Sequence, residues 1–207
     1  MNKPLILLGG GGHCKSVIEV AESSGKTIKG ILDLPSEVGK TCLGYPILGS
    51  DEDIPLYVDE CEFVVTLGFI KDPIIRIKLH QMVLDSKGEF ATIVASSAQV
   101  SKHATIAPGT VVLHNACINA GAQIGHGCII NTLACIEHDT IIEDYCHIST
   151  GAIINGGSKI GRATFIGSQA IIAQSINIPP ECVVSAGEFI NKTITSKGII
   201  KTRSSPT

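Results

Sequence analysis

The chain has 207 residues, of which 44% are hydrophobic, and its formal net charge is −3. This length is enough to bury a sizeable core in one or two domains, and the lack of a basic block argues against nucleic acid as a partner. The apolar run at residues 5–8 is too short for a signal peptide or a membrane span, so we expect a cytoplasmic protein with no membrane partner.

The first part of the chain alternates between strand-like and helix-like patterns. This alternation predicts a Rossmann-like α/β domain with a small parallel sheet over residues 1–90. The expected strands are residues 3–8, 27–32 and 63–67, and the expected helices are residues 14–24 and 72–86. The expected buried face of the second helix is Ile75, Leu79, Met82 and Val83.

A glycine-rich loop, Gly9-Gly10-Gly11-Gly12-His13, joins the first strand to the first helix, and Asp33 ends the second strand. Such a loop brings backbone N–H groups close to phosphate oxygens, and an acid about 20 residues further on can bind a ribose hydroxyl. The motif is imperfect, because Cys14 stands at the third glycine position of G-x-G-x-x-G. By itself the loop therefore fits either nucleotide binding or a structural tight turn.

From Val94 to Ile190 the chain has isoleucine or valine at every sixth position without a break. A period of six indicates a solenoid in which each hexad forms one short strand and one turn, and three hexads form one 18-residue coil. The fourth residue after each aliphatic one is small in nearly every hexad, so a large and a small side chain both point inward. We therefore predict a parallel β-helix over residues 91–195, followed by a tail at 196–207. Positive φ angles are expected at Gly109, Gly121, Gly127, Gly151, Asn119, Asn131 and Asn155.

Three segments together resemble one family: the loop Gly9–His13, Ile136-Glu137-His138-Asp139, and Cys146-His147-Ile148-Ser149-Thr150-Gly151-Ala152 followed by Gly156. The chain resembles the sialic acid O-acetyltransferase type of hexapeptide-repeat sugar acetyltransferase. Within that group it is similar to bacterial N-acetyltransferases that act on nucleotide-linked 4-amino-4,6-dideoxyhexoses. The resemblance implies that the solenoid is a left-handed parallel β-helix.

The resemblance also implies an activity, namely transfer of acetyl from acetyl-CoA to the 4-amino group of the sugar. The pathway would be the biosynthesis of lipopolysaccharide or another bacterial surface polysaccharide or glycan. The implied assembly is a homotrimer, with its active sites in clefts between neighbouring solenoids. The small domain would bind the sugar nucleotide, and no metal would be needed.

Individual roles follow from the same resemblance. His138 is the general base, Asp139 orients it, His147 contacts the acetyl end of the cofactor, and the backbone N–H of Gly156 lies near the thioester oxygen. The residues implied to bind the sugar nucleotide are Gly9, Gly10, Gly11, Gly12, His13, Asp33 and Gly68. The tail departs from the G-x-P-A-K-like segment of relatives and leaves Lys201 and Arg203 as candidates to contact CoA phosphates.

The proposed chemistry is coherent without the family. A sugar amine must lose a proton as it attacks a thioester, and histidine suits that transfer. A carboxylate that holds one ring nitrogen fixes the tautomer and leaves the other nitrogen as the base, while a fixed donor stabilises the oxyanion. Since 138 + 18 = 156, His138 and Gly156 should stack in successive coils, and the missing side chain leaves room for a thioester.

The residue before each inward aliphatic should point outward, and sorting these residues by 18 gives three columns. We expect the first two, largely apolar, to be covered by neighbouring subunits or CoA, so that Phe165→Asp breaks the trimer. The mostly polar third column should face solvent or the small domain. The first column is Val111, Ile129, His147, Phe165 and Val183; the second is Gln99, Cys117, Cys135, Ile153, Ile171 and Phe189; the third is Thr105, Gln123, Ile141, Lys159 and Asn177.

Alternatives stay open at the level of sequence. A γ-type carbonic anhydrase uses the same solenoid, but it needs a five-residue spacing between two histidines that is missing here. An O-acetyltransferase acting on a sugar hydroxyl, such as that of sialic acid, would use the same base, whereas a non-catalytic sugar-nucleotide scaffold would have lost His138. The eight cysteines are expected to be free thiols, and the nucleotide (UDP, dTDP or GDP) is not specified.

Overall fold

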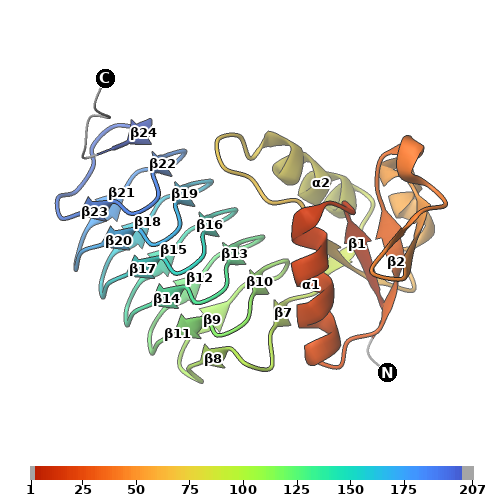
Figure 1. Cartoon of the computed structure of the whole chain (residues 1–207), viewed down its shortest axis with the longest axis horizontal. Coiled ribbons are helices and arrows are strands. Elements are labelled where there is room, and N and C mark those ends of the chain that lie inside the picture. Colours follow the sequence, from red (N-terminus) through yellow and green to blue (C-terminus); the bar gives the residue numbers. More distant parts are fainter. Residues whose placement is uncertain (1–2, 202–207) are drawn as a thin grey trace. The chain divides into compact units, whose positions relative to one another are not determined.

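The computed structural model describes residues 3–201, and the chain divides into two compact units, Met1–Ser96 and Ser97–Thr207. Figure 1 shows helices and a sheet in the first unit and a stack of short-stranded coils in the second. Within residues 3–201, no helix has the length and apolar character needed to cross a bilayer.

The N-terminal unit is built around a buried parallel strand, β1 (Leu5–Leu8), whose four residues are all inaccessible to solvent. Such a continuous apolar run is typical of a strand covered on both faces. β1 pairs in parallel with β2 (Ile28–Leu32) on one side and with β5 (Glu62–Val65) on the other. The sheet order is β3-β4-β2-β1-β5-β6. The helices are α1 (Gly12–Ser23) and α2 (Ile74–Asp85), and the remaining elements are η1 (Pro35–Glu37), β3 (Thr41–Cys42), β4 (Tyr45–Gly49), η2 (Asp51–Leu56), β6 (Glu89–Phe90) and β7 (Ile93–Val94).

Two features of this unit differ from the expectation. The hairpin of β3 and β4 is absent from the prediction, because Pro46 and Gly49 interrupt its apolar pattern. On α2, Ile75 is 66% exposed, whereas Arg76 is buried in its place. The helix begins two residues later than expected, and its buried face is turned so that a long cationic side chain lies in the core.

The second unit is a left-handed parallel β-helix, as predicted. Each coil contributes one two-residue strand to each of three parallel sheets, and strands 18 residues apart pair in register. The first sheet contains β10 (Val111–Val112), β13 (Ile129–Ile130), β16 (His147–Ile148), β19 (Phe165–Ile166), β22 (Val183–Val184) and β24 (Ile199–Ile200). The second contains β8 (Gln99–Val100), β11 (Cys117–Ile118), β14 (Cys135–Ile136), β17 (Ile153–Ile154), β20 (Ile171–Ile172) and β23 (Phe189–Ile190). The third contains β9 (Thr105–Ile106), β12 (Gln123–Ile124), β15 (Ile141–Ile142), β18 (Lys159–Ile160) and β21 (Asn177–Ile178).

The inward columns are filled as the hexads predict. Ile148 and Ile154 are fully buried, and so are the small residues Cys128 and Cys146 in the same interior. Buried hydroxyls in the small column are bonded to backbone carbonyls, as when Ser158 Oγ donates to Ala173 O at 2.8 Å. All eight cysteines carry free thiols, and burial raises the pKa of Cys146 well above its ordinary value.

The corners of the prism have positive φ at the third residue after each inward aliphatic from Ile106 to Val184, which includes Gly109, Gly121, Gly127 and Gly151 as expected. The expectation for Asn119, Asn131 and Asn155 is wrong, because they directly follow the aliphatic residue and precede the left-handed position. Their side chains bond across the corners instead; Asn155 Nδ2, for example, donates to Ile172 O at 2.8 Å. Non-glycine residues adopt the left-handed conformation at Asn115, Leu133, Asp139, Tyr145, Ala163, Gln169, Ser175 and Glu181.

The three outward columns have the predicted register but different exposures. In the first column Phe165 is only 8% exposed within a single chain, so Phe165→Asp would disturb the fold before it tests association. The second column is half-buried at Ile153 and Ile171 and 54% exposed at Phe189. The third column is exposed. The second column is therefore the apolar stripe that a single chain leaves accessible.

Candidate active site

The glycine loop follows β1 at the carboxyl edge of the N-terminal sheet. Gly9 has φ +102°, and a Cβ there would lie 2.6 Å from Leu67 Cδ2, so only glycine fits. A Cβ at Gly11 or Gly12 would meet no atom within 4 Å, so the loop faces open space where α1 begins. No side chain caps α1, and its first turn has no acid. This helix end suits an anion.

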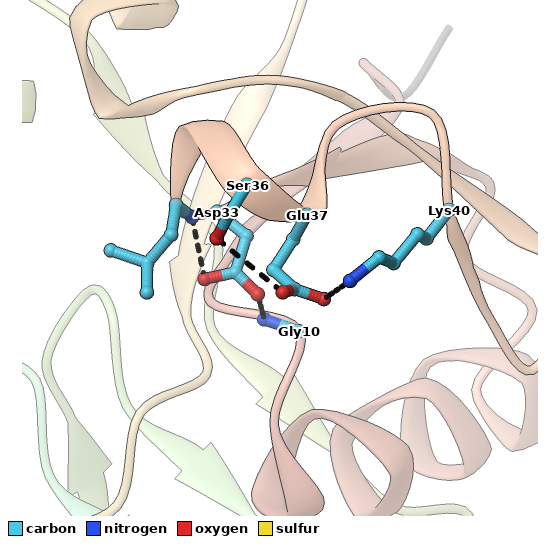
Figure 2. A network of polar contacts seen from close by, with 6 residues as sticks. Gly10, Asp33, Ser36, Glu37 and Lys40 are labelled. Atoms are coloured by element: carbon cyan, nitrogen blue, oxygen red, sulfur yellow. Dashed lines mark hydrogen bonds and ion pairs between the residues drawn. The ribbon is translucent and has the colours of Figure 1, made fainter.

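Asp33 holds the loop from the end of β2. Its Oδ2 accepts a hydrogen bond from Gly10 N and its Oδ1 accepts one from Leu34 N, both at 2.8 Å. Figure 2 shows the carboxylate between these two groups, beside a surface network in which Lys40 Nζ donates to Glu37 Oε2 at 2.8 Å. That hydrogen bond lowers the pKa of Glu37. Asp33 thus orients the loop, and it also faces a cleft described below.

The loop after β5, which contains Gly68, is fixed to the same edge. Thr66 Oγ1 donates to Leu8 O at 2.9 Å. Arg76 Nη1 donates to Val65 O and Leu67 O, both at 2.7 Å. The structure therefore brings the glycine loop, Asp33 and the Gly68 loop to one edge of the sheet. His13 lies in the first turn of α1, half-buried, and Gly68 is exposed.

A cleft of about 200 Å³, which the sequence did not predict, adjoins Asp33. Burial and the nearby Asp33 raise the pKa of Asp51, and Lys78 acts in the opposite direction. The cleft has an apolar part and a charged part, which suits a flat polar ring. Its lining residues are Asp33, Leu34, Pro35, Ser50, Asp51, Glu52, Lys78 and Met82. The cleft could have been predicted only by recognising β4 as a strand, since Ser50 and Asp51 reach this edge because β4 joins the sheet.

In the solenoid, His138 and Asp139 occupy the corner between β14 and β15. His138 Nδ1 lies 2.9 Å from Asp139 Oδ2, and the two side chains are 59% and 72% exposed. Because a carboxylate only accepts, Nδ1 carries the proton in the neutral ring, which leaves the lone pair on Nε2. A Cβ at Gly156 would lie 2.6 Å from His138 Nε2, so the ring is stacked against this glycine as the spacing predicts. The arrangement gives an accessible imidazole in the tautomer of a general base.

His147 lies elsewhere on the same solenoid. It is on β16 and only 7% exposed, with its ring edge-on to Phe165 at 5.1 Å between centroids. Asn131 Nδ2 donates to His147 Nε2 at 3.2 Å, and Asn131 Oδ1 accepts from Thr132 N at 2.7 Å. His138 is at the edge between the second and third sheets, whereas His147 is on the first sheet, opposite that edge. A single chain does not bring these two histidines together.

The remaining predicted contacts are in the tail. Ile199–Ile200 forms β24 and extends the first sheet by pairing with β22, and Lys201 after it is exposed. Arg203 lies outside the described residues. Over residues 3–201, no group of three or more His, Cys, Asp or Glu side chains has a metal-binding arrangement.

Comparison with known proteins adds to this geometry. Residues 4–83 match the PglD N-terminal domain family. No curated protein sequence matches the chain. Among solved structures, PerB from Caulobacter crescentus in complex with CoA and GDP-perosamine is 28% identical, with a TM-score of 0.87 and coverage of 95% of this chain and 92% of PerB.

Two further structures extend the likeness. The acetyltransferase domain of PglB from Neisseria gonorrhoeae is 27% identical, with a TM-score of 0.86 and coverage of 96% of each chain. WeeI from Acinetobacter baumannii, at 18% identity and a TM-score of 0.61, covers 93% of this chain and 96% of its own and shares the fold. Over nearly its whole length the chain is thus similar to bacterial acetyltransferases, including a perosamine N-acetyltransferase, and the resemblance predicted from its sequence is confirmed.

Proposed function

We propose that the protein is an acetyl-CoA-dependent N-acetyltransferase. Its acceptor is the 4-amino group of a nucleotide-linked 4-amino-4,6-dideoxyhexose, for bacterial surface polysaccharide or glycan biosynthesis. The observation that carries the proposal is the His138–Asp139 pair, stacked on Gly156 at a solenoid corner. The likeness to an enzyme solved with CoA and GDP-perosamine supports the choice of both substrates.

The catalytic step follows from the tautomer of His138. Nε2 takes the proton of the sugar amine as its nitrogen attacks the thioester carbonyl. Asp139, held at Nδ1, stabilises the imidazolium that forms. We assign the backbone N–H of Gly156 to the developing oxyanion. Collapse of the tetrahedral intermediate breaks the C–S bond, and the imidazolium returns the proton to the departing CoA thiolate.

The N-terminal unit is proposed to bind the sugar nucleotide. The start of α1 and the glycine loop provide backbone N–H groups for the diphosphate. The cleft beside Asp33 receives the nucleoside, with Leu34, Pro35 and Met82 available to the faces of the base. His13 and Gly68 border the same edge of the sheet and complete the proposed binding set.

The active form is proposed to be a cytoplasmic homotrimer, since acetyl-CoA and nucleotide sugars are cytoplasmic metabolites. His147 is proposed to contact the acetyl end of the cofactor, but it lies on the face opposite the edge that holds His138. One site therefore needs His138 from one copy and His147 from the next. The half-buried apolar stripe at Ile153 and Ile171 supports association through the second column.

The activity is tested by thiol release from acetyl-CoA against a panel of 4-amino sugar nucleotides carrying GDP, UDP or dTDP, with free sialic acid as the competing acceptor. We expect turnover on a 4-amino sugar nucleotide and none on sialic acid. Turnover on sialic acid alone would replace the proposal with the O-acetyltransferase alternative.

The trimer is tested by sedimentation of Ile171→Asp and, as a matched control on the exposed third column of the same coil, Asn177→Asp. Ile171→Asp should sediment as a monomer and lose activity, whereas Asn177→Asp should remain trimeric and active. An active monomeric Ile171→Asp variant would refute the shared site, because each site would then be complete in one chain.

A further inference from the structure

Asp139 lies over a glycine of the preceding coil. Since 121 + 18 = 139, Gly121 and Asp139 occupy the same corner position in successive coils, and both have positive φ, +77° and +59°. A Cβ on Gly121 would collide with Asp139 Oδ1. The carboxylate therefore rests in the space that the missing side chain leaves, and from there its other oxygen reaches His138 Nδ1.

The backbone alone does not demand glycine at this corner. Asn115 and Leu133 stand one coil apart at equivalent corners, both with positive φ and both with side chains. Tyr145 and Ala163 form a second such pair. The fold thus accepts L-residues at the left-handed position, at a modest cost in strain. Room for the carboxylate of Asp139 is a separate requirement, specific to residue 121.

The histidine and the acid are held in the same way from opposite sides. His138 stacks against Gly156 in the following coil, and Asp139 against Gly121 in the preceding one. Both side chains are more than half exposed, so these coils are the main surfaces that restrict their rotamers. A side chain at residue 121 would push the carboxylate away from Nδ1.

We propose that Gly121 is a positioning residue for acetyl transfer, which sets the rotamer of Asp139 and through it the tautomer of His138. This inference rests on the proposed function, because it takes His138 as the base. Gly121 itself contacts neither substrate.

The test compares Gly121→Ala with Gly187→Ala. Gly187 has φ +69° and no atom within 4 Å of a Cβ, so its alanine variant has matched backbone strain without the collision. We expect similar losses of thermal stability in both variants. The kcat of acetyl transfer should fall roughly ten- to a hundredfold in Gly121→Ala only, with KM for both substrates nearly unchanged.

Two further measurements isolate the route of the effect. In an Asp139→Ala background, Gly121→Ala should cause no further loss of kcat, because the group on which it acts is gone. In ¹⁵N-histidine spectra assigned with His138→Asn, His138 should carry its proton on Nδ1 in the wild type and in Gly187→Ala. In Gly121→Ala the proton should move to Nε2 in a substantial fraction of molecules.

Equal kcat in Gly121→Ala and Gly187→Ala would overturn the inference. So would a full additional loss in the Asp139→Ala background, or an unchanged His138 tautomer. Failure of the proposed function is distinguishable, because it appears as wild-type protein that transfers no acetyl group, while the tautomer of His138 is measured without turnover.

Discussion

The two units hold their candidate site residues by different physical means. In the solenoid, His138 and Asp139 are held by glycines one coil away, at a fixed spacing of 18 residues. In the N-terminal unit, the glycine loop is held by Asp33, and Thr66 and Arg76 bond to the ends of β1 and β5. The regularly stacked coils thus position the proposed base, whereas long-range polar contacts shape the proposed sugar-nucleotide site. Substitutions at the solenoid site should therefore change kcat, whereas substitutions at the N-terminal site should change KM or stability.

Among the changes that leave the His138 and Asp139 side chains in place, the largest expected effect comes from Gly156→Ala in the solenoid. A Cβ there lies 2.6 Å from His138 Nε2, so the ring must move from its position. We expect kcat to fall about a hundredfold with little change in KM for the sugar nucleotide. Steady-state thiol-release kinetics measure both constants. An unchanged kcat would contradict the stacking of the base on this glycine.

Arg76→Met tests the long-range contacts of the N-terminal unit. The variant removes the charged donor to two carbonyls, the buried Val65 O and the partly buried Leu67 O, while it keeps an apolar stem. We expect a loss of about 2 kcal/mol in the free energy of unfolding of this unit. Urea unfolding measures the loss, and the exposed Lys78→Met on the same helix is the control. Equal stability of the two variants would contradict a supporting role for Arg76.

Gly10→Ala is the N-terminal counterpart of Gly156→Ala. Its Cβ would lie 2.8 Å from Asp33 Oδ2, which would displace the carboxylate and the glycine loop. We expect KM for the sugar nucleotide to rise about tenfold, equivalent to about 1.4 kcal/mol, with kcat nearly unchanged. If kcat falls instead while KM stays constant, the division of roles between the units is wrong.

The smallest effect is expected at the ion pair of Lys159 with Glu143, at 2.7 Å on the solenoid surface. The hydrogen bond from Lys159 lowers the pKa of Glu143. Because the pKa of Glu143 is lower in the folded state than in the unfolded state, its charged form stabilises the fold at pH values above the unfolded-state pKa. This stabilisation is lost as the pH falls through the folded-state pKa. Lys159→Ala should therefore cost less than about 0.5 kcal/mol at neutral pH, and the difference from wild type should shrink below about pH 4. A difference that grows on acidification would contradict this sign.

The sequence predicts the solenoid well because the pattern that determines its structure is short and repeats along the chain. The spacing of 18 residues places Gly156 beside His138 and gives the register of all three outward columns. The sequence-based prediction is wrong where the period alone does not decide the structure. Positive φ occurs at the third residue after the aliphatic and not at the asparagines that directly follow it. The burial of Phe165 depends on contacts outside its own hexad.

The N-terminal unit is less predictable because its site is assembled from distant segments. Motif spacing identifies the glycine loop and Asp33. The cleft, however, depends on β4, and the proline in that strand interrupts the apolar pattern by which a strand is predicted. Arg76 satisfies carbonyls across the sheet edge, and no local pattern marks a cationic side chain as buried.

The central claim, that His138 is the base for acetyl transfer, is tested most directly by kcat of His138→Ala with acetyl-CoA and a 4-amino sugar nucleotide that the wild type turns over. The account predicts a fall of about 10²–10⁴ in kcat at neutral pH, with a smaller change in KM and the trimer intact. A His138→Ala variant that keeps nearly the wild-type kcat would contradict the account.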